Sequence, residues 1–595
     1  MSRARTIARA DLRHALRHRL VWGAVVLLGL MFLPSTRSIA ASGHRTIGEF
    51  LLQMPFDLIT YGLVVVAAVG YNAVVGERAV GTVRFVLGLP GTRRDLLLGK
   101  LLSRAAIVVF ALTVILAVAN VFVALGYGRL YLAPFWTMAA WMLLYGVVWS
   151  AITVGYSAAF SSQFRTLGAL VVTYVAFSPN FGVWSVLVRP LFALVFTGSL
   201  DAPGYESLAA APLWVRATER LNPLTDFWYA MQWSVEFVGP GSPAGGPLPH
   251  VVGTALFLLF GAMPLGFGYR RFRRADLGEA ETGLRWGDRL WRRIHGAAAP
   301  VTGGRLRLGP DGSSARVRTL AAADLRHALQ NWVVVGGVAV TLLLAGPRLW
   351  QTLDPASRYP VTEQLTDVAF TVAIPVLVLG IAVGYRAVAG ERDAATARLT
   401  LGLPATRRDL VLAKLLSRVT VALAVLAALV AYTEAVVVVR FGGVYPAAFV
   451  AWAGYVLVFG VVWTSAVVGL SAAVSSRYRT LAAAFGTFLL FSPSNGLWGP
   501  VVRPLIGLVF TGRLSAQGLA HSADGGPAWF RYPDHLSPFV ALDRVHEGLF
   551  AAVGHAQPHM HAPPPLVLYS VAVLAAFATV PVWLGYRRFD RADLG

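Results

Sequence analysis

The chain has 595 residues, of which 56% are hydrophobic and only 13% are charged, a balance that is typical of membrane proteins. It has no cysteine, which excludes disulfide scaffolds, thiolate metal sites and cysteine nucleophiles. The formal net charge of +22 would suggest a nucleic-acid partner in a soluble protein, but in a membrane protein the position of the charges matters more than their sum.

The N-terminal segment is basic and loosely amphipathic. Apolar residues recur at helical spacing from Ile7 to Leu20 among arginines, which predicts a helix in the headgroup layer of a membrane. The apolar run 20–33 follows, and together the two resemble a signal peptide. However, ADLRHAL at 10–16 recurs at 323–329, again before an apolar run. A signal peptide has no reason to recur in mid-chain, so we predict a retained first membrane span.

Five further spans are predicted in the first half of the chain. Their approximate bounds are 56–75, 101–125, 134–160, a segment that begins near Leu167, and 251–267. The fifth is interrupted at Ser178-Pro179-Asn180 and at Arg189-Pro190. Because proline removes a backbone donor and clashes with the preceding turn, we expect a break or kink there. Segment 199–249, rich in Pro, Gly and Trp, and segment 513–564 of the second half are predicted to be large outer loops.

The second half of the chain repeats the first. ERAVGTVRFVLGLPGTRRDLLLGKLLSR (77–104) returns as ERDAATARLTLGLPATRRDLVLAKLLSR (391–418), with 19 of 28 positions identical. The same separation relates Gly198 to Gly512. We therefore predict an all-α membrane protein with about twelve transmembrane helices, arranged as two tandem six-helix repeats with pseudo-two-fold symmetry. The predicted domains are a first transmembrane repeat (1–278), a cytoplasmic linker (279–315) and a second transmembrane repeat (316–595).

Basic residues predict the orientation of these spans. Arginines concentrate in the N-terminal helix, in the polar segments after the second span of each half, in the linker and at the C-terminus, whereas the outer loops hold few. By the positive-inside rule both termini are predicted to be cytoplasmic, in a multi-pass protein of the plasma membrane. The charge is then a topology signal, and no nucleic acid is needed to explain it. Lys100 and Lys414 are the only lysines, and we assign no function to this bias.

Each copy of the repeated segment is predicted to form a polar cytoplasmic hairpin between the second and third spans of its half. Thr92-Arg-Arg-Asp95 and Thr406-Arg-Arg-Asp409 have the pattern of capping boxes that start the next helix. One interpretation is a stiff turn whose basic residues lie on lipid headgroups. The other is a docking element for a cytoplasmic partner, and two copies imply two identical or homologous partners about a two-fold axis.

The hairpins resemble the permeases of type-2 ABC exporters. The residues that carry the resemblance in the first copy are Glu77, Gly81, Thr82, Leu87, Pro90, Arg93 and Lys100. The second copy keeps Glu391, Thr396, Leu401, Pro404, Arg407 and Lys414, but has Ala395 in place of the glycine. The resemblance extends to the six-span plan and the basic interfacial helix. It departs in the fusion of two halves, since members of the family commonly carry one six-span unit and dimerise.

In that family this segment is the coupling helix, which lies in a cleft of an ATPase subunit. The resemblance therefore implies the membrane-spanning permease of an ATP-driven exporter, which couples ATP hydrolysis by two cytoplasmic ABC ATPase subunits to substrate efflux. ATP and Mg would bind those partner subunits, and no cofactor would bind this chain. The residues implied to dock the ATPases are Glu77, Arg78, Gly81, Thr82, Arg84, Pro90, Glu391, Arg392, Thr396, Arg398 and Pro404. The Gly81-to-Ala395 difference leaves the equivalence of the two hairpins open.

No catalytic motif accompanies this pattern. The sequence has no G-x-x-x-x-G-K-[ST], G-x-S-x-G or H-E-x-x-H motif, so the chain is not expected to be an enzyme. Two alternatives remain, a secondary transporter or channel without an ATPase, and a scaffold that docks an ATPase without transport. The first usually needs several intramembrane charges, and only Glu434 qualifies clearly.

Several polar residues are candidates for roles inside or outside the spans. Glu434 and Asn120 occupy equivalent positions, and we predict that they face each other in the outer half of a cargo cavity, although an ion pair of Glu434 with Arg440 is an equally good interpretation. Arg189 and Arg503 either cap the broken fifth spans or line an outer vestibule, and we favour the caps. A metal site at His555, His559, Met560 and His561 is possible in principle, but none is predicted. The substrate is not identified, although the apolar spans favour a hydrophobic or amphipathic cargo.

Overall fold

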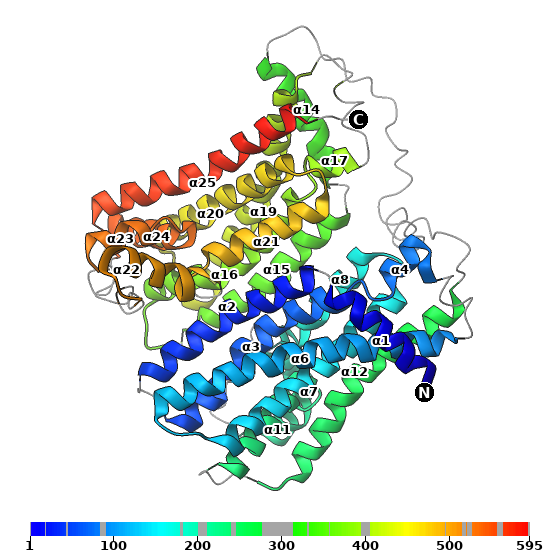
Figure 1. Ribbon diagram of the computed structural model, residues 1–595. Coiled ribbons are helices and arrows are strands. Elements are labelled where there is room, and N and C mark those ends of the chain that lie inside the picture. The colour runs from blue at the N-terminus through cyan, green and yellow to red at the C-terminus, as the bar shows by residue number, and fades with distance from the viewer. Residues whose placement is uncertain are drawn as a thin grey trace. The chain divides into compact units, whose positions relative to one another are not determined.

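The computed structural model divides into two compact units, Met1–Ala298 and Ala299–Gly595 (Figure 1). The residues that it describes are 2–17, 19–42, 46–83, 91–178, 183–199, 211–239, 245–275, 313–329, 332–355, 357–393, 401, 405–493, 496–514, 519, 526–555 and 563–592. Within these residues the regular elements are helices, and no strand occurs. The predicted all-α membrane fold is confirmed.

The first unit contains the helices of the first repeat. They are α1 (Ser2–Leu16), α2 (Arg19–Ser42), α3 (Ile47–Gly70), α4 (Val75–Val80), α6 (Arg93–Tyr127), α7 (Leu132–Ala159), α8 (Gln163–Phe177), the π-helical turn η1 (Trp184–Val188), α9 (Arg189–Thr197), α10 (Leu213–Glu219), α11 (Pro223–Val238) and α12 (Leu248–Arg274).

The second unit repeats this order. Its helices are α14 (Ser313–Leu329), α15 (Trp332–Thr352), α16 (Val361–Gly384), α17 (Ala389–Asp393), α19 (Arg407–Phe441), α20 (Pro446–Ala473), α21 (Arg477–Phe491), the π-helical turn η2 (Trp498–Val502), α22 (Arg503–Thr511), α23 (Ala528–Asp534), α24 (Pro538–Ala552) and α25 (Pro564–Asp590).

Seven helices in the described part are long and apolar enough to cross a membrane. They are α6, α7, α12, α16 with its extension to Arg392, α19, α20 and α25. Shorter apolar helices occupy the predicted first and fifth spans, and α3 occupies the second. The predicted break in the fifth span is present, since α8 is followed by η1 and α9 rather than continuing as one helix.

One helix forms the centre of each unit, α7 in the first and α20 in the second. α7 packs against α3, α6, α11 and α12, and α20 packs against α16, α19, α24 and α25. The contact of α7 with α12 depends on glycine, because a Cβ on Gly155 would lie 2.4 Å from the Pro264 carbonyl oxygen. Gly469 meets Pro581 of α25 in the same way. Small residues thus let the helix backbones touch, as is usual in membranes.

The two segments predicted as large outer loops contain packed helices, which were not predicted. α11 contacts α7 and α12, and α24 contacts α20 and α25. Both helices begin at a polar cap followed by proline, Asn222-Pro223 and Ser537-Pro538, and the cap side chain accepts from backbone N–H groups of the first turn. Proline at the first helical position starts these helices rather than preventing them.

Candidate functional site

The first leg of each hairpin is the segment that contains α4 or α17, and it is held by hydrogen bonds to the C-terminal end of the central helix of its unit. The Ser157 hydroxyl of α7 accepts hydrogen bonds from the N–H groups of Val74 and Val75 at 3.0 and 3.1 Å, and Arg78 donates to the Ala158 carbonyl. Ser471 of α20 accepts in the same way from Val388 and Ala389, and Arg392 donates to the Val474 carbonyl. The short helices α4 and α17 are therefore fixed to the spans on which they lie.

The second leg of each hairpin is the start of α6 or α19. The predicted capping boxes fix it, and both are confirmed. The Thr92 and Thr406 side chains accept from the N–H groups of Asp95 and Asp409, whose carboxylates accept in return from the threonine N–H. The arginine that follows each threonine then reaches the last helix of its unit. Arg93 donates to the carbonyls of Phe272, Arg273 and Ala275, and Arg407 to those of Phe589, Asp590 and Ala592. A single guanidinium thus satisfies the free carbonyls at the end of α12 or α25.

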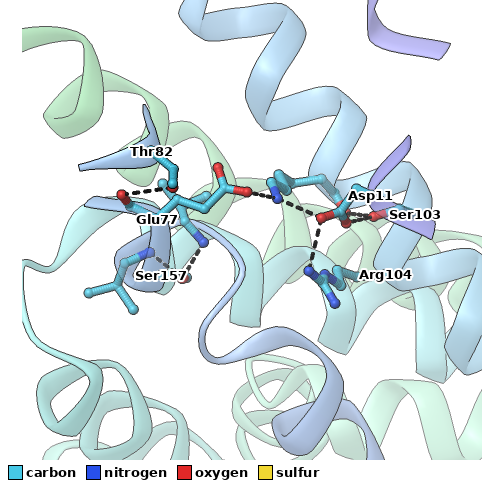
Figure 2. A network of polar contacts seen from close by, with 9 residues as sticks. Asp11, Glu77, Thr82, Ser103, Arg104 and Ser157 are labelled. Carbon is cyan, nitrogen blue, oxygen red and sulfur yellow. Dashed lines mark hydrogen bonds and ion pairs between the residues drawn. The ribbon is translucent and has the colours of Figure 1, made fainter. Parts of the chain in front are cut away.

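A buried ion network, the first polar cluster, lies where α1, α4 and α6 meet. Its members are Asp11, Glu77, Lys100, Ser103 and Arg104. The Lys100 ammonium donates to Asp11 Oδ1 at 2.5 Å and to Glu77, while Ser103 and Arg104 donate to Asp11. Figure 2 shows Asp11, Ser103 and Arg104 gathered on one side of this network and Glu77 on the other. Lys100 is only 4% exposed and Asp11 only 7%.

The second unit has the equivalent network, the second polar cluster. Its members are Asp324, Glu391, Lys414, Ser417 and Arg418. Lys414 donates to Asp324 Oδ1 at 2.5 Å and pairs with Glu391, and Arg418 donates to Asp324 at 2.9 Å. Burial raises the pKa of the Asp324 carboxyl, but the two cations and the serine hydroxyl around it outweigh this effect, so the net pKa is lowered. Asp324 therefore stays ionised, and two acids balance two bases.

In each polar cluster, a lysine connects two carboxylates that come from different helices. A compact ammonium with three donors can lie between two carboxylates that come from different helices, whereas a planar guanidinium is larger and matches one carboxylate at a time. The only two lysines of the chain occupy this position. The sequence carried a signal for the third helix as well, because Asp11 and Asp324 belong to the repeated ADLRHAL segments.

The structure places several predicted docking residues inside the protein's own hydrogen-bond network. Glu77 contacts Lys100, Arg78 contacts the end of α7, and Thr82 donates to the Glu77 carbonyl at 3.2 Å. Gly81 ends α4 with a φ of 79°, in the left-handed region that favours glycine. Glu391 and Arg392 are held as their counterparts are. Arg84, Pro90, Ala395, Thr396, Arg398 and Pro404 lie outside the described residues.

The candidate cavity residues lie in different units. Asn120 on α6 is buried, and Glu434 on α19 is half-buried. The alternative ion pair of Glu434 with Arg440 is not formed. Arg440 instead contacts the Trp350 carbonyl and the Asp354 carboxylate and stacks on the Trp350 ring, because it projects from the last turn of α19 toward the end of α15. That Asn120 and Glu434 face each other stays a prediction.

Within the described residues, Arg189 and Arg503 bind carboxylates and do not cap carbonyls of the break, contrary to the favoured expectation. Arg189 Nε donates to Glu219 at 2.7 Å, and Arg503 forms a two-point contact with Asp534 at 2.8 and 3.0 Å. Trp498 Nε1 also donates to Asp534. Each arginine thus joins the broken fifth segment to a short helix, α10 or α23. No sequence pattern indicated these ion pairs, because the partner acids lie 30 and 31 residues away.

Two ionisable side chains of α24, outside the candidate spans, have pKa values that move in opposite directions. Burial and the Glu547 carboxylate raise the pKa of Asp543 from 3.8 to about 7, and burial lowers the pKa of His546 from 6.5 to about 4. The folded protein holds the Asp543 proton more tightly than the unfolded chain does. Asp543 therefore makes stability fall as the pH rises from 3.8 to about 7. His546 makes stability rise with pH, because the unfolded chain binds a proton that the folded protein does not.

These two slopes oppose each other in the wild type. Relative to the wild-type profile, the thermal midpoint of Asp543→Asn is therefore expected to rise as the pH is raised from 4 to 6.5, and that of His546→Gln is expected to fall. Intrinsic-fluorescence melts of the purified protein across this range measure both. Variant profiles that run parallel to the wild type would show that neither group titrates as stated.

No group of metal-ligating side chains occurs within the part of the chain that the structure describes. Of the His-rich segment, His555 follows α24, and residues 559–561 lie outside the described residues.

Both repeats match one known family. Residues 5–277 and 315–594 each match the family described as ABC-2 family transporter protein. No curated protein matches the chain. Each matched segment includes one hairpin and one complete polar cluster, so the two halves carry the same set of site residues.

Proposed function

The chain belongs to the ABC-2 family of transporter proteins, and from this we propose that it is the membrane subunit of an ATP-driven exporter whose two hairpins dock two cytoplasmic ABC ATPase subunits. ATP and Mg would bind those partners, since no nucleotide-binding motif occurs in this sequence. We place the protein in the plasma membrane with both termini in the cytoplasm, on the distribution of its arginines.

One observation carries the proposal, namely that both legs of each hairpin are tied to transmembrane helices. The first leg is bonded to the end of α7 and, through Glu77, to α6. The second leg begins α6 and holds the end of α12 through Arg93. A force applied to such a hairpin would move three spans together, whereas a loosely attached loop would yield alone. The second unit offers the same connections to α20, α19 and α25.

The stoichiometry of the complex tests this proposal. We expect the chain, purified gently from its own membranes, to carry a subunit with a G-x-x-x-x-G-K-[ST] motif, at two copies per chain by mass photometry. The reconstituted complex is expected to hydrolyse ATP at a rate that differs from that of the free ATPase. A single copy per chain would contradict the equivalence of the hairpins, and transport without any such subunit would favour the secondary-transporter alternative.

We propose that the cargo passes Asn120 and Glu434. Asn120 Oδ1 and Glu434 Oε2 are buried and, within the described residues, accept no hydrogen bond from the protein. A buried polar atom without a partner costs free energy, so it is often kept for a ligand. An amide opposite a carboxylate avoids the repulsion that two acids would suffer there. A hydrophobic or amphipathic cargo fits the apolar spans.

The orientation has its own test, because the native chain lacks cysteine. A single cysteine introduced at Ser207 or Ser522 is expected to react with an impermeant maleimide in intact cells, since both positions lie in the predicted outer segments. A cysteine at Ser313, at the end of the linker, is expected to react only after permeabilisation. Labelling of the Ser313 position in intact cells would invert the topology.

A further inference from the structure

An open groove of about 290 Å³ runs between α19 and α25 of the second unit. The residues that line it are Arg408, Val411, Leu412 and Leu415 from α19, and Ala578, Thr579, Val582, Trp583 and Tyr586 from α25. On each helix these positions recur at helical spacing, so they form one continuous face. The volume is just below the usual range for drug-sized ligands, about 300–1,000 Å³.

The groove has a polar end and an apolar end. Arg408 lies in the first turn of α19, and Tyr586 lies near the end of α25, so both are at the hairpin side of the unit. From Arg408 to Leu415 the helix rises roughly 10 Å, about a third of the hydrocarbon core of a bilayer. An occupant would therefore start at headgroup level and extend into the acyl-chain region.

The mouth of the groove is positively charged. Arg408 is exposed and has no hydrogen-bond or ion-pair partner among the described residues. Arg587 stacks on the Trp583 ring, with its guanidinium carbon 4.2 Å from the ring centroid, and Trp583 itself is 49% exposed. An aromatic ring with adjacent guanidinium groups is a usual arrangement at the membrane interface, where anionic headgroups are available.

We propose that this groove binds an anionic phospholipid, with one acyl chain between α19 and α25 and the phosphate at Arg408 and Arg587. The apolar walls exclude a soluble anion as the main occupant, and the unpartnered guanidinium favours an anionic over a zwitterionic headgroup. The site is separate from the hairpin residues proposed to dock the ATPases. It distinguishes the two halves, because the position of Trp583 is taken by Gly266 in the first repeat.

Photocrosslinking with phosphatidylglycerol and phosphatidylcholine that carry the same diazirine-labelled acyl chain tests the proposal on the purified full-length protein. We expect crosslinks in 411–415 and 578–583, with phosphatidylglycerol favoured about 30-fold, the factor that corresponds to about 1 kcal/mol for each of the two arginines. Arg408→Gln, which leaves Arg587 in place, is expected to lower this preference to about fivefold. Ala578→Phe, which fills the apolar end, is expected to lower crosslinking of both lipids.

The matched control is Arg94→Gln, the equivalent exposed arginine of α6, which has no tryptophan opposite it. This variant is expected to keep the preference, and the thermal midpoints of all variants check folding. Equal labelling by the two lipids in the wild type, or the same loss in Arg94→Gln, would show only diffuse attraction to basic residues and would overturn the proposal. Crosslinks from the groove to a second protein chain would overturn it too, since the occupant would then be protein.

Discussion

Replacing Lys100 with methionine is expected to lower the free energy of unfolding of the first unit by about 3–5 kcal/mol. The change leaves Asp11 and Glu77 side by side, with only Arg104 for balance, at a site where Asp11 is 7% exposed. A buried charge that loses its partner costs far more than the pair contributes when it is intact. Thermal melts followed by size-exclusion fluorescence of the solubilised protein should show the midpoint lowered by on the order of 10 °C.

The chain offers matched controls for this result. Arg94→Gln removes an exposed cation from the same helix and should change the midpoint by less than a degree or two. The triple variant Asp11→Asn, Glu77→Gln, Lys100→Met removes the whole charge set, so it should recover part of the loss. The thermal midpoint of Lys100→Arg should lie between those of Arg94→Gln and Lys100→Met, because the guanidinium does not fit the space between the two acids. A Lys100→Met protein as stable as Arg94→Gln would show that the network contributes nothing.

The spans and the capping boxes could be predicted because each depends on residues close together in sequence, and the duplication could be predicted because 77–104 and 391–418 share 19 of 28 residues. Apolar runs set the spans, and Thr92 meets Asp95 within one turn. The polar clusters could not be predicted, because Asp11 and Lys100 are 89 positions apart in the sequence and meet only when α1 packs on α6. What the sequence did contain was their recurrence, an aspartate in each ADLRHAL and a lysine in each hairpin segment.

The helices of the segments predicted as outer loops were missed for a different reason. Proline and glycine are abundant in 199–249, and this composition suggested a loop, although Asn222-Pro223 is a helix start. The partner of Arg189 was missed because its neighbours in sequence offer exposed carbonyls, while Glu219 approaches only through the packing of α10 on α9. The sequence shows the helix start at Asn222-Pro223 and the charge of Arg189. Long-range packing, however, decides which elements and side chains these residues contact.

The double variant Arg84→Glu, Arg398→Glu is expected to weaken ATPase binding at least 30-fold without changing the thermal midpoint. In the sequence, each residue lies between the two legs of its hairpin, and neither is a member of a polar cluster. Reversal of a charge at a docked surface typically costs about 2 kcal/mol or more, which corresponds to about 30-fold. Glu77 is a poor site for this experiment, because Glu77→Arg would also set a cation against Lys100 and Arg104.

Affinity measured with the purified ATPase subunit, by biolayer interferometry on the nanodisc-embedded chain, gives the result directly. The control is Arg274→Glu, Arg591→Glu, which makes the same charge change at exposed positions at the ends of α12 and α25, beside the hairpins. Losses in both double variants would indicate general attraction between a basic surface and an acidic partner. A loss in the hairpin variant alone would locate the docking site.

The single variants Arg84→Glu and Arg398→Glu should then differ, since Gly81 ends α4 in a left-handed conformation that Ala395 adopts less readily. If the hairpin double variant binds the ATPase as the wild type does, the hairpins are stiff cytoplasmic turns, and the partner must bind elsewhere on the inner face.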